Sequence, residues 1–256
     1  MSNFGASAGW GLVVGGSLLA GALAAAFLRL PTRVAAGLTA FGGGVLMAAV
    51  ALELVPEADA GAGAALTAVG LLAGMFVYVA ADQWLSQDED MAMMRRSGHA
   101  AAAGREMHMP PPSHAEAARG ESIAAGLFVD GVPESIALGL TIAEGEIGVA
   151  LLAGIVLGNL VEAYGAAQPI IAGGHTRAFA IWLLGMIGVA LALATVLGGT
   201  VLSDASAEMV GVAQAVAAGA VLAVISIAIA PHAFSEVSRM AAVATVAGFI
   251  VGYLLS

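Results

Sequence analysis

The sequence contains no cysteine and no lysine, and it has few charged or aromatic residues. Without cysteine the chain has no disulfides and no thiolate metal ligands. Charged residues make up 10% of the chain and hydrophobic residues 60%, and the mean hydropathy is +0.96. A soluble domain carries about a quarter charged residues and could not bury this much apolar surface. These shortages exclude a soluble globular protein and predict a membrane protein.

Positive charge is confined to alternate connections between the apolar stretches. The arginines are Arg29 and Arg33, then Arg95, Arg96, Arg105 and Arg119, then Arg177, then Arg239. The intervening connections carry acids: Glu57 and Asp59, Glu144 and Glu146, Asp204 and Glu208. Arginine accumulates in cytoplasmic loops, so this alternation predicts that both termini are extracytoplasmic. Arginine is also too sparse and too scattered for nucleic-acid binding.

Eight apolar stretches are long enough to cross a hydrocarbon layer of roughly 30 Å, which takes about 20 helical residues. The backbone must satisfy its own hydrogen bonds in lipid, so the stretches are predicted to be helices. We expect them near 9–28, 34–55, 63–85, 120–142, 147–172, 176–202, 208–231 and 238–255. Glycines four residues apart predict close helix packing at Gly11 and Gly15, Gly70 and Gly74, and Gly154 and Gly158.

The predicted fold is therefore an all-α membrane protein with a single membrane domain. Three helices lie in residues 1–85 and five in residues 120–256. Helices 1–3 and 6–8 could flank the central pair as inverted repeats. Residues 86–119 contain His99, His108, His114 and several methionines, and we expect a disordered cytoplasmic loop. Two interpretations of these histidines stay open: weak metal binding, or incidental histidines in a disordered segment.

Four polar residues lie inside the fourth and fifth predicted helices. Asp130 and Glu134 are four residues apart, and Asn159 and Glu162 are three apart, so each pair shares one helical face. Counted at 1.5 Å per residue, all four lie roughly 15 to 20 Å from the cytoplasmic ends. Ionisable residues at that depth are costly and mark functional sites. Three carboxylates in one dry place require protons or a cation, and their oxygens suit a divalent metal ion.

The alternative is a protonated, hydrogen-bonded structural cluster. Three acids that lack an arginine partner make that alternative the weaker one. Pro133 and Pro169 interrupt the hydrogen bonding of these same two helices, so a freed carbonyl could turn towards the site.

Two segments resemble the metal-binding signatures of the ZIP family of metal transporters. Asp130-Gly131-Val132-Pro133-Glu134 resembles the His-Asn-x-Pro-Glu signature, and residues 158–162 resemble the related signature on the next helix. The stretches at 42–49 and 219–226 resemble the family's second and seventh helices. Eight spans, outside termini and a histidine-bearing loop also match. The resemblance therefore covers nearly the whole chain.

The resemblance implies an eight-helix bundle whose fourth and fifth helices hold the metal, and it implies that two copies can form a homodimer. Members of the family move divalent cations, usually zinc, into the cytoplasm. By position, the metal ligands here are Asp130, Glu134, Asn159 and Glu162. The family's second histidine falls on Gly158, which has no side chain to offer. Carboxylates in place of imidazole harden the site and favour Mn²⁺, Fe²⁺ or Co²⁺ relative to zinc.

Further residues are weaker candidates for the metal pathway. Met47 could offer a soft ligand, although methionine in an apolar helix usually packs in the core. Glu53 either recruits cations at the outer mouth or forms a solvated helix end. His232 and Glu236, four apart, form either an exit station or an interfacial helix cap.

From these residues we expect a transporter of the bacterial inner membrane, embedded in the lipid bilayer. Its cargo is a divalent ion (Zn²⁺, or Mn²⁺, Fe²⁺, Co²⁺ or Cd²⁺). We expect no enzyme activity and no cofactor, because no arrangement of catalytic residues and no phosphate-binding loop is present. Two alternatives remain: a metal sensor or scaffold that has lost transport, and an intramembrane hydrolase. The hydrolase is the poorer one, because the chain has no HExxH motif.

Overall fold

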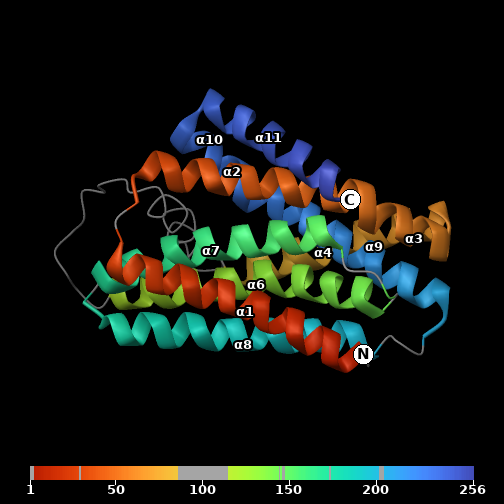
Figure 1. The fold of residues 1–256 in the computed structure, drawn as a ribbon, viewed down its shortest axis with the longest axis horizontal. Coiled ribbons are helices and arrows are strands. Elements are labelled where there is room, and N and C mark those ends of the chain that lie inside the picture. The colour runs from red at the N-terminus through yellow and green to blue at the C-terminus, as the bar shows by residue number, and fades with distance from the viewer. Residues whose placement is uncertain are drawn as a thin grey trace.

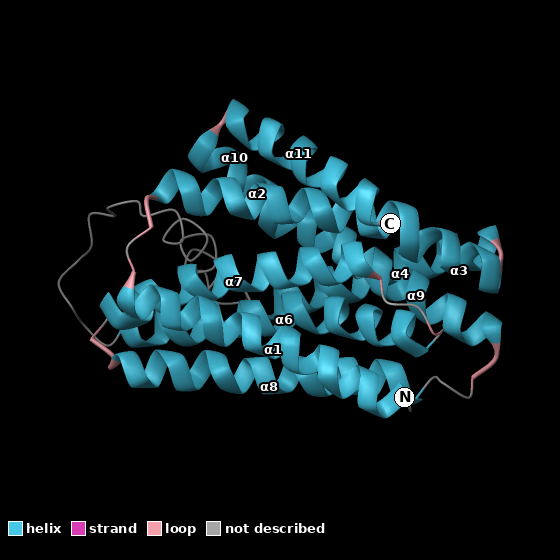
Figure 2. Ribbon diagram, viewed as in Figure 1, coloured by secondary structure: helices cyan, strands magenta, loops and turns pink. Residues whose placement is uncertain are grey.

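The structure, a computed structural model, describes residues 3–28, 30–85, 115–143, 145, 148–172, 174–201 and 205–256. Every regular element of these residues is helical, so the predicted all-α class is confirmed (Figure 2). The α-helices are α1 (Asn3–Phe27), α2 (Thr32–Ala49), α3 (Val55–Ala62), α4 (Ala64–Leu85), α6 (Ala115–Ala143), α7 (Val149–Ala172), α8 (Arg177–Val201), α9 (Ala207–Val224), α10 (Ala230–Val237) and α11 (Arg239–Leu255). Two π-helical segments, η1 (Val50–Leu54) and η2 (Ile225–Ile229), join α2 to α3 and α9 to α10.

The length and apolar character of the helices identify a membrane-embedded protein. Within the described residues, six helical stretches are long and apolar enough to cross a membrane. They are Phe4–Phe27, Arg33–Ala62, Ala64–Gln83, Val149–Gln168, Arg177–Val201 and Ala207–Ile227. Helix α11 is apolar as well but shorter. Large apolar side chains such as Leu12, Phe76 and Leu193 are exposed on the outside of the bundle, where lipid would cover them.

Two of the predicted helix ends are wrong. The second helix does not end near residue 55 but continues through η1 and α3 to Ala62, so Glu57 and Asp59 lie inside a helix. The seventh helix does not end at residue 231 but continues through η2 and α10 to Val237. A proline follows each π segment, in the first turn of α3 and of α10. Proline lacks an N–H and its ring displaces the carbonyl four residues earlier, which a wider π turn accommodates.

The predicted loop at residues 86–119 is also too long at one end. Helix α6 begins at Ala115, so residues 115–119 belong to a helix, while residues 86–114 lie outside the described residues. Pro133 lies inside α6, which remains α-helical through Ala143. The departures from α-helical geometry therefore occur in the second and seventh predicted helices, whereas we expected them in the fourth and fifth.

The helices pack as two groups (Figure 1). Helices α1, α6, α7 and α8 form one group, in which α8 packs against both α1 and α6, and α7 packs against α1 and α6. The other group is α2, α3, α4, α9, α10 and α11, in which α2 pairs with α11 and α4 with α9. The main contacts between the groups are α2 with α7 and α6 with α9. Exchanging the first three predicted helices with the last three, and α6 with α7, reproduces this same set of partners.

Glycine produces backbone-to-backbone contact inside each group. Gly15 of α1 faces the backbone of Gly188 in α8, Gly74 of α4 faces Val216 in α9, and Gly44 of α2 faces Thr245 in α11. The backbones of the two groups approach less closely: a Cβ placed on Gly154 of α7 would lie 3.1 Å from the nitrogen of Leu46 in α2, and one on Gly42 would lie 3.4 Å from the nitrogen of Gly158. Among the glycines described, backbone approaches closer than 3.0 Å occur only within a group.

The glycine pairs proposed from sequence mostly lie at these close contacts. Gly11 and Gly15 face α8, Gly70 and Gly74 face α9, and Gly154 faces Leu46 of α2. These five assignments are confirmed. Gly158 is the exception, since a Cβ there would meet no atom of the described residues within 4 Å.

The two ends of the bundle differ in charge. Helices α2, α8 and α11 all begin at one end of the bundle (Figure 1), and Arg33, Arg177 and Arg239 lie within the first two residues of those helices. Helix α3 and the start of α9 lie at the opposite end, with Glu57, Asp59 and Glu208. The alternation of charge along the sequence thus becomes a separation in space.

Candidate metal site

Two polar side chains are buried on the packed central helices α6 and α7. Glu134 of α6 is 5% exposed and Asn159 of α7 is 2% exposed. The Nδ2 amide of Asn159 has no hydrogen-bond partner in the described part of the chain. A buried amide without a partner costs about 1–3 kcal/mol, and because Nδ2 is a donor, an acceptor such as a carboxylate, a carbonyl or a water molecule would satisfy it.

The remaining two predicted ligands lie on the same helices. Glu162 is half-buried on α7, and Glu134 and Glu162 each take part in a hydrogen bond or electrostatic interaction. Asp130 lies in α6 one turn before Glu134, and its side chain is outside the described residues. Helices α6 and α7 pack against each other, so these polar residues lie on neighbouring helices of the bundle.

Gly158, the residue before Asn159, has no described atom next to its Cβ position. This glycine is buried, yet the position of a Cβ on it would be more than 4 Å from every described atom outside its own stretch of helix. Gly154 and Glu162 are each one turn away on the same face of α7, and Gly154 on that face contacts Leu46 of α2. The space therefore lies on the side of α7 that faces the other helix group.

Glu53 is not a solvated helix end. It lies within η1, half-buried, and its Oε2 would be 2.7 Å from a Cβ on Gly148, the residue before α7 begins. The Cβ position on Gly148 also lies 3.5 Å from the hydroxyl of Thr141, near the end of α6. The Glu53 carboxylate therefore lies close to the residue that precedes α7, at the end of the bundle that carries the acidic residues.

The other candidates lie elsewhere or outside the described residues. Met47 is exposed and lines an apolar groove with Ile229 and Thr245, so it neither packs in the core nor belongs to the face of α2 that meets α7. His232 and Glu236 lie one turn apart in α10, but their side chains are not described. The loop histidines His99, His108 and His114 fall in the segment that the structure leaves undescribed. The described side chains include no group of three or more His, Cys, Asp or Glu placed to hold a metal.

Sequence reasoning missed a hydrogen bond between α9 and α3. Gln214 is 0% exposed, and its Nε2 donates to Oε2 of Glu57 at 2.8 Å. The signal was present, because a glutamine in the middle of an apolar stretch is an uncommon intramembrane polar residue. Glu57 was expected in a connection between helices, so no partner for Gln214 was predicted.

A second set of hydrogen bonds, also not predicted from the sequence, joins the end of α1 and its link to α2 to helix α7. The hydroxyl of Tyr164 accepts from the backbone N–H of Leu30 at 2.7 Å and donates to the carbonyl of Leu28 at 3.3 Å. One turn later, Nε2 of Gln168 donates to the carbonyl of Ala25 at 2.9 Å. These bonds satisfy backbone groups at the end of α1 that have no partner within the helix.

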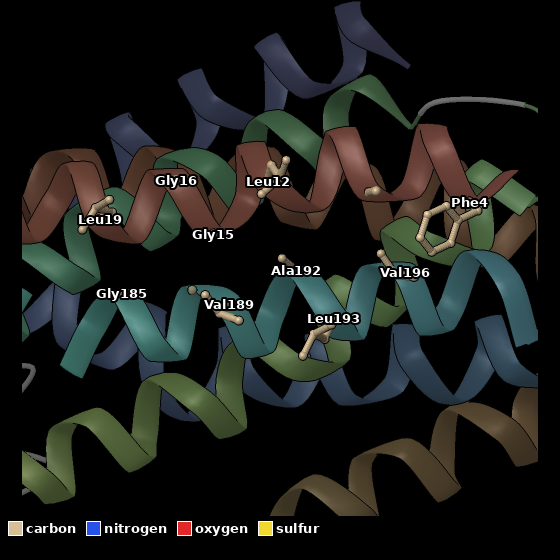
Figure 3. A pocket seen from close by; sticks show the side chains of 12 residues that line it. Phe4, Leu12, Gly15, Gly16, Leu19, Gly185, Val189, Ala192, Leu193 and Val196 are labelled. Carbon is tan, nitrogen blue, oxygen red and sulfur yellow. The ribbon is translucent and has the colours of Figure 1, made fainter. Parts of the chain in front are cut away.

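An apolar groove on the described surface is lined by none of the candidate metal ligands. Figure 3 shows a groove of about 490 Å³ between α1 and α8, with Leu12, Leu19, Val189 and Leu193 along its sides and Gly15 near its floor. None of its lining residues is titratable, so it offers no ligand for a cation. Its walls instead form part of the lipid-facing surface.

No protein-family model matches this chain, and no curated protein matches it in sequence. The fold and the buried residues therefore define only the class, which is an all-helical, membrane-embedded protein with polar residues buried in its central helices.

Proposed function

We propose that this protein transports a divalent transition-metal cation across the membrane, as ZIP-type transporters do. The observation that carries the proposal is the burial of Glu134 and Asn159 on the packed helices α6 and α7 beside open space at Gly158. A carboxylate and an amide oxygen are hard ligands for such an ion. Asp130 and Glu162, on the same two helices, complete the proposed ligand set.

The packing of the bundle supports alternating access. The space at Gly158 lies where α7 faces α2, which is the contact between the two helix groups. Tight glycine contacts hold each group together, while the groups meet through longer contacts. One group moving against the other would then expose the site to each side in turn, as in transporters built from repeats.

The separation of charge supports the proposed orientation. When α6 and α11 are counted with the other spans, the chain crosses the membrane eight times in our proposal. The end with Arg33, Arg177 and Arg239 is then cytoplasmic, and both termini are extracytoplasmic. Glu53, at the acidic end, would lie on the route by which a cation reaches Glu134.

Uptake into proteoliposomes tests the proposal directly. The purified chain would be reconstituted, and uptake of labelled Mn²⁺, Fe²⁺, Co²⁺, Zn²⁺ and Cd²⁺ measured for the wild type and for Glu134→Gln. The substitution keeps the size of the side chain and removes its charge. We expect it to lower the initial uptake rate on the order of tenfold or more, because a lost ligand weakens a buried metal site at least as much as a lost supporting contact does.

Glu208→Gln is the matched control, because it removes one carboxylate from an exposed position in the first turn of α9. Its uptake rate should equal that of the wild type. Uptake that survives Glu134→Gln and Glu162→Ala together would refute the proposed site. Metal binding without any uptake would instead identify the protein as a sensor or scaffold.

A further inference from the structure

A groove at the arginine-rich end of the bundle combines a cation with an apolar wall. It lies between the start of α2 and the first half of α11, where the turn between α10 and α11 closes it, and its volume is about 600 Å³. Arg33 and Gly37, one turn apart on α2, form one side. Met240, Val243 and Ala247 of α11 form the other, with Ser238 at the turn.

The apolar wall follows one face of α11. Positions 240, 243, 244 and 247 repeat every three or four residues, so they form a stripe roughly 10 Å long down the helix. Met240 is 62% exposed and Val243 is 59% exposed, so the stripe is accessible from the surrounding lipid. Gly37 leaves the opposite side open, because a Cβ there would meet nothing within 4 Å.

The charged end of the groove suits an anion. Arg33 is exposed and makes no hydrogen bond or ion pair within the described part of the chain. None of the described residues that line the groove is acidic. Helix α2 begins here without a side-chain cap on its first turn, so its unsatisfied N–H groups add positive potential. The start of α11 is offset by the end of α10 at the same turn. The guanidinium group matches phosphate geometry with two parallel hydrogen bonds.

We propose that this groove binds one anionic phospholipid, with its phosphate on Arg33 and an acyl chain along the α11 stripe. The occupant follows from charge complementarity at one end and apolar lining along the rest, both at the rim of a membrane-embedded helix pair. Basic pockets between membrane helices bind anionic headgroups for the same reason. The inference depends on the membrane location alone and is independent of metal transport.

Native mass spectrometry of the purified full-length protein tests the site. The protein would be titrated in detergent with phosphatidylglycerol or with phosphatidylcholine of the same acyl chains. We expect the wild type to prefer phosphatidylglycerol. Arg33→Gln should weaken phosphatidylglycerol binding about fivefold, since one arginine near an anionic headgroup is worth about 1 kcal/mol. It should weaken phosphatidylcholine binding less, because the choline cation of that zwitterionic headgroup offsets the charge of its phosphate. Gly37→Leu fills the groove and should weaken binding of both lipids.

Two controls match these changes. Arg177→Gln removes one exposed arginine at the same end of the bundle, from α8, and Gly9→Leu adds the same side chain at another glycine with nothing within 4 Å. Both should bind lipid like the wild type. Equal binding of the two lipids by the wild type, or equal loss in Arg33→Gln and Arg177→Gln, would overturn the proposal. So would a dimer that Gly37→Leu dissociates without any change in lipid binding, because the occupant would then be a second copy.

Discussion

Gly158 and Gly74 are both glycines inside helices, yet their surroundings are opposite. A Cβ on Gly74 would collide with the carbonyl of Val216 and lie 2.9 Å from the nitrogen of Ala220, whereas one on Gly158 would meet no described atom within 4 Å. The difference separates two uses of glycine in one protein. At Gly74 the missing side chain lets two backbones touch. At Gly158 it leaves a volume beside Glu162 that a cation and its ligands could occupy.

Alanine at these two positions should therefore change stability in opposite directions. Gly158→Ala is expected to raise the free energy of unfolding by up to about 1 kcal/mol, because alanine favours a helix over glycine. Gly74→Ala is expected to lower it by about 1–3 kcal/mol, because the helices must separate. Reversible unfolding in mixed micelles with a denaturing detergent measures both. Equal losses at the two positions would show that the space at Gly158 does not exist.

At the scale of elements, the two π segments alter which side chains face inward. Each inserts one wide turn before a proline, so α3 and α10 present faces that a regular α-helix through Thr32–Ala49 or Ala207–Val224 would not. The wide turn of η1 carries Glu53, and α3 carries Glu57, which accepts the hydrogen bond from Gln214. Helix α3 is thus fastened to α9 by a polar bond as well as by glycine contacts.

Loss of that bond should be measurable. Gln214→Leu removes the donor from a half-buried carboxylate and is expected to lower the free energy of unfolding by about 1–3 kcal/mol. Gln83→Leu, at an exposed position of α4, makes the same chemical change and should stay within about 0.5 kcal/mol of the wild type. A loss no larger than that of Gln83→Leu would mean that the hydrogen bond contributes nothing.

At the scale of the molecule, the two helix groups make one mechanical prediction. The chain has no cysteine, so an engineered pair of cysteines would have no native thiol to react with. A Cβ on Gly42 of α2 lies 3.7 Å from the Cβ of Leu157 on α7, which is within the range a disulfide requires. Gly42→Cys with Leu157→Cys should therefore crosslink the two groups.

If the groups move against each other during transport, oxidation of this pair should stop metal uptake and reduction should restore it. Each single-cysteine variant, treated in the same way, provides the control. Full uptake by the quantitatively crosslinked protein would rule out relative motion at the contact of α2 with α7.

The helical class and the position of the buried polar residues could be predicted from the sequence. Glu134 and Asn159 interrupt long apolar stretches, and hydropathy is a local property, so their burial followed from their neighbours in the chain. The ends of the second and seventh helices were missed at Pro56 and Pro231. Proline usually ends a helix, and the neighbouring residues do not indicate that a π turn will form and allow the helix to continue beyond the proline.

The sequence by itself determined that this chain is a membrane-embedded helical bundle, because composition and apolar length decide partition into lipid segment by segment. It also determined that the arginines lie in alternate connections between the predicted helices. Only the tertiary structure decided that Gln214 meets Glu57, that Met47 faces away from α7, and that space remains at Gly158. These three features depend on which faces of helices far apart in the sequence meet. The glycine contacts that determine the meeting faces each need two segments of the chain, so neither segment alone reveals them.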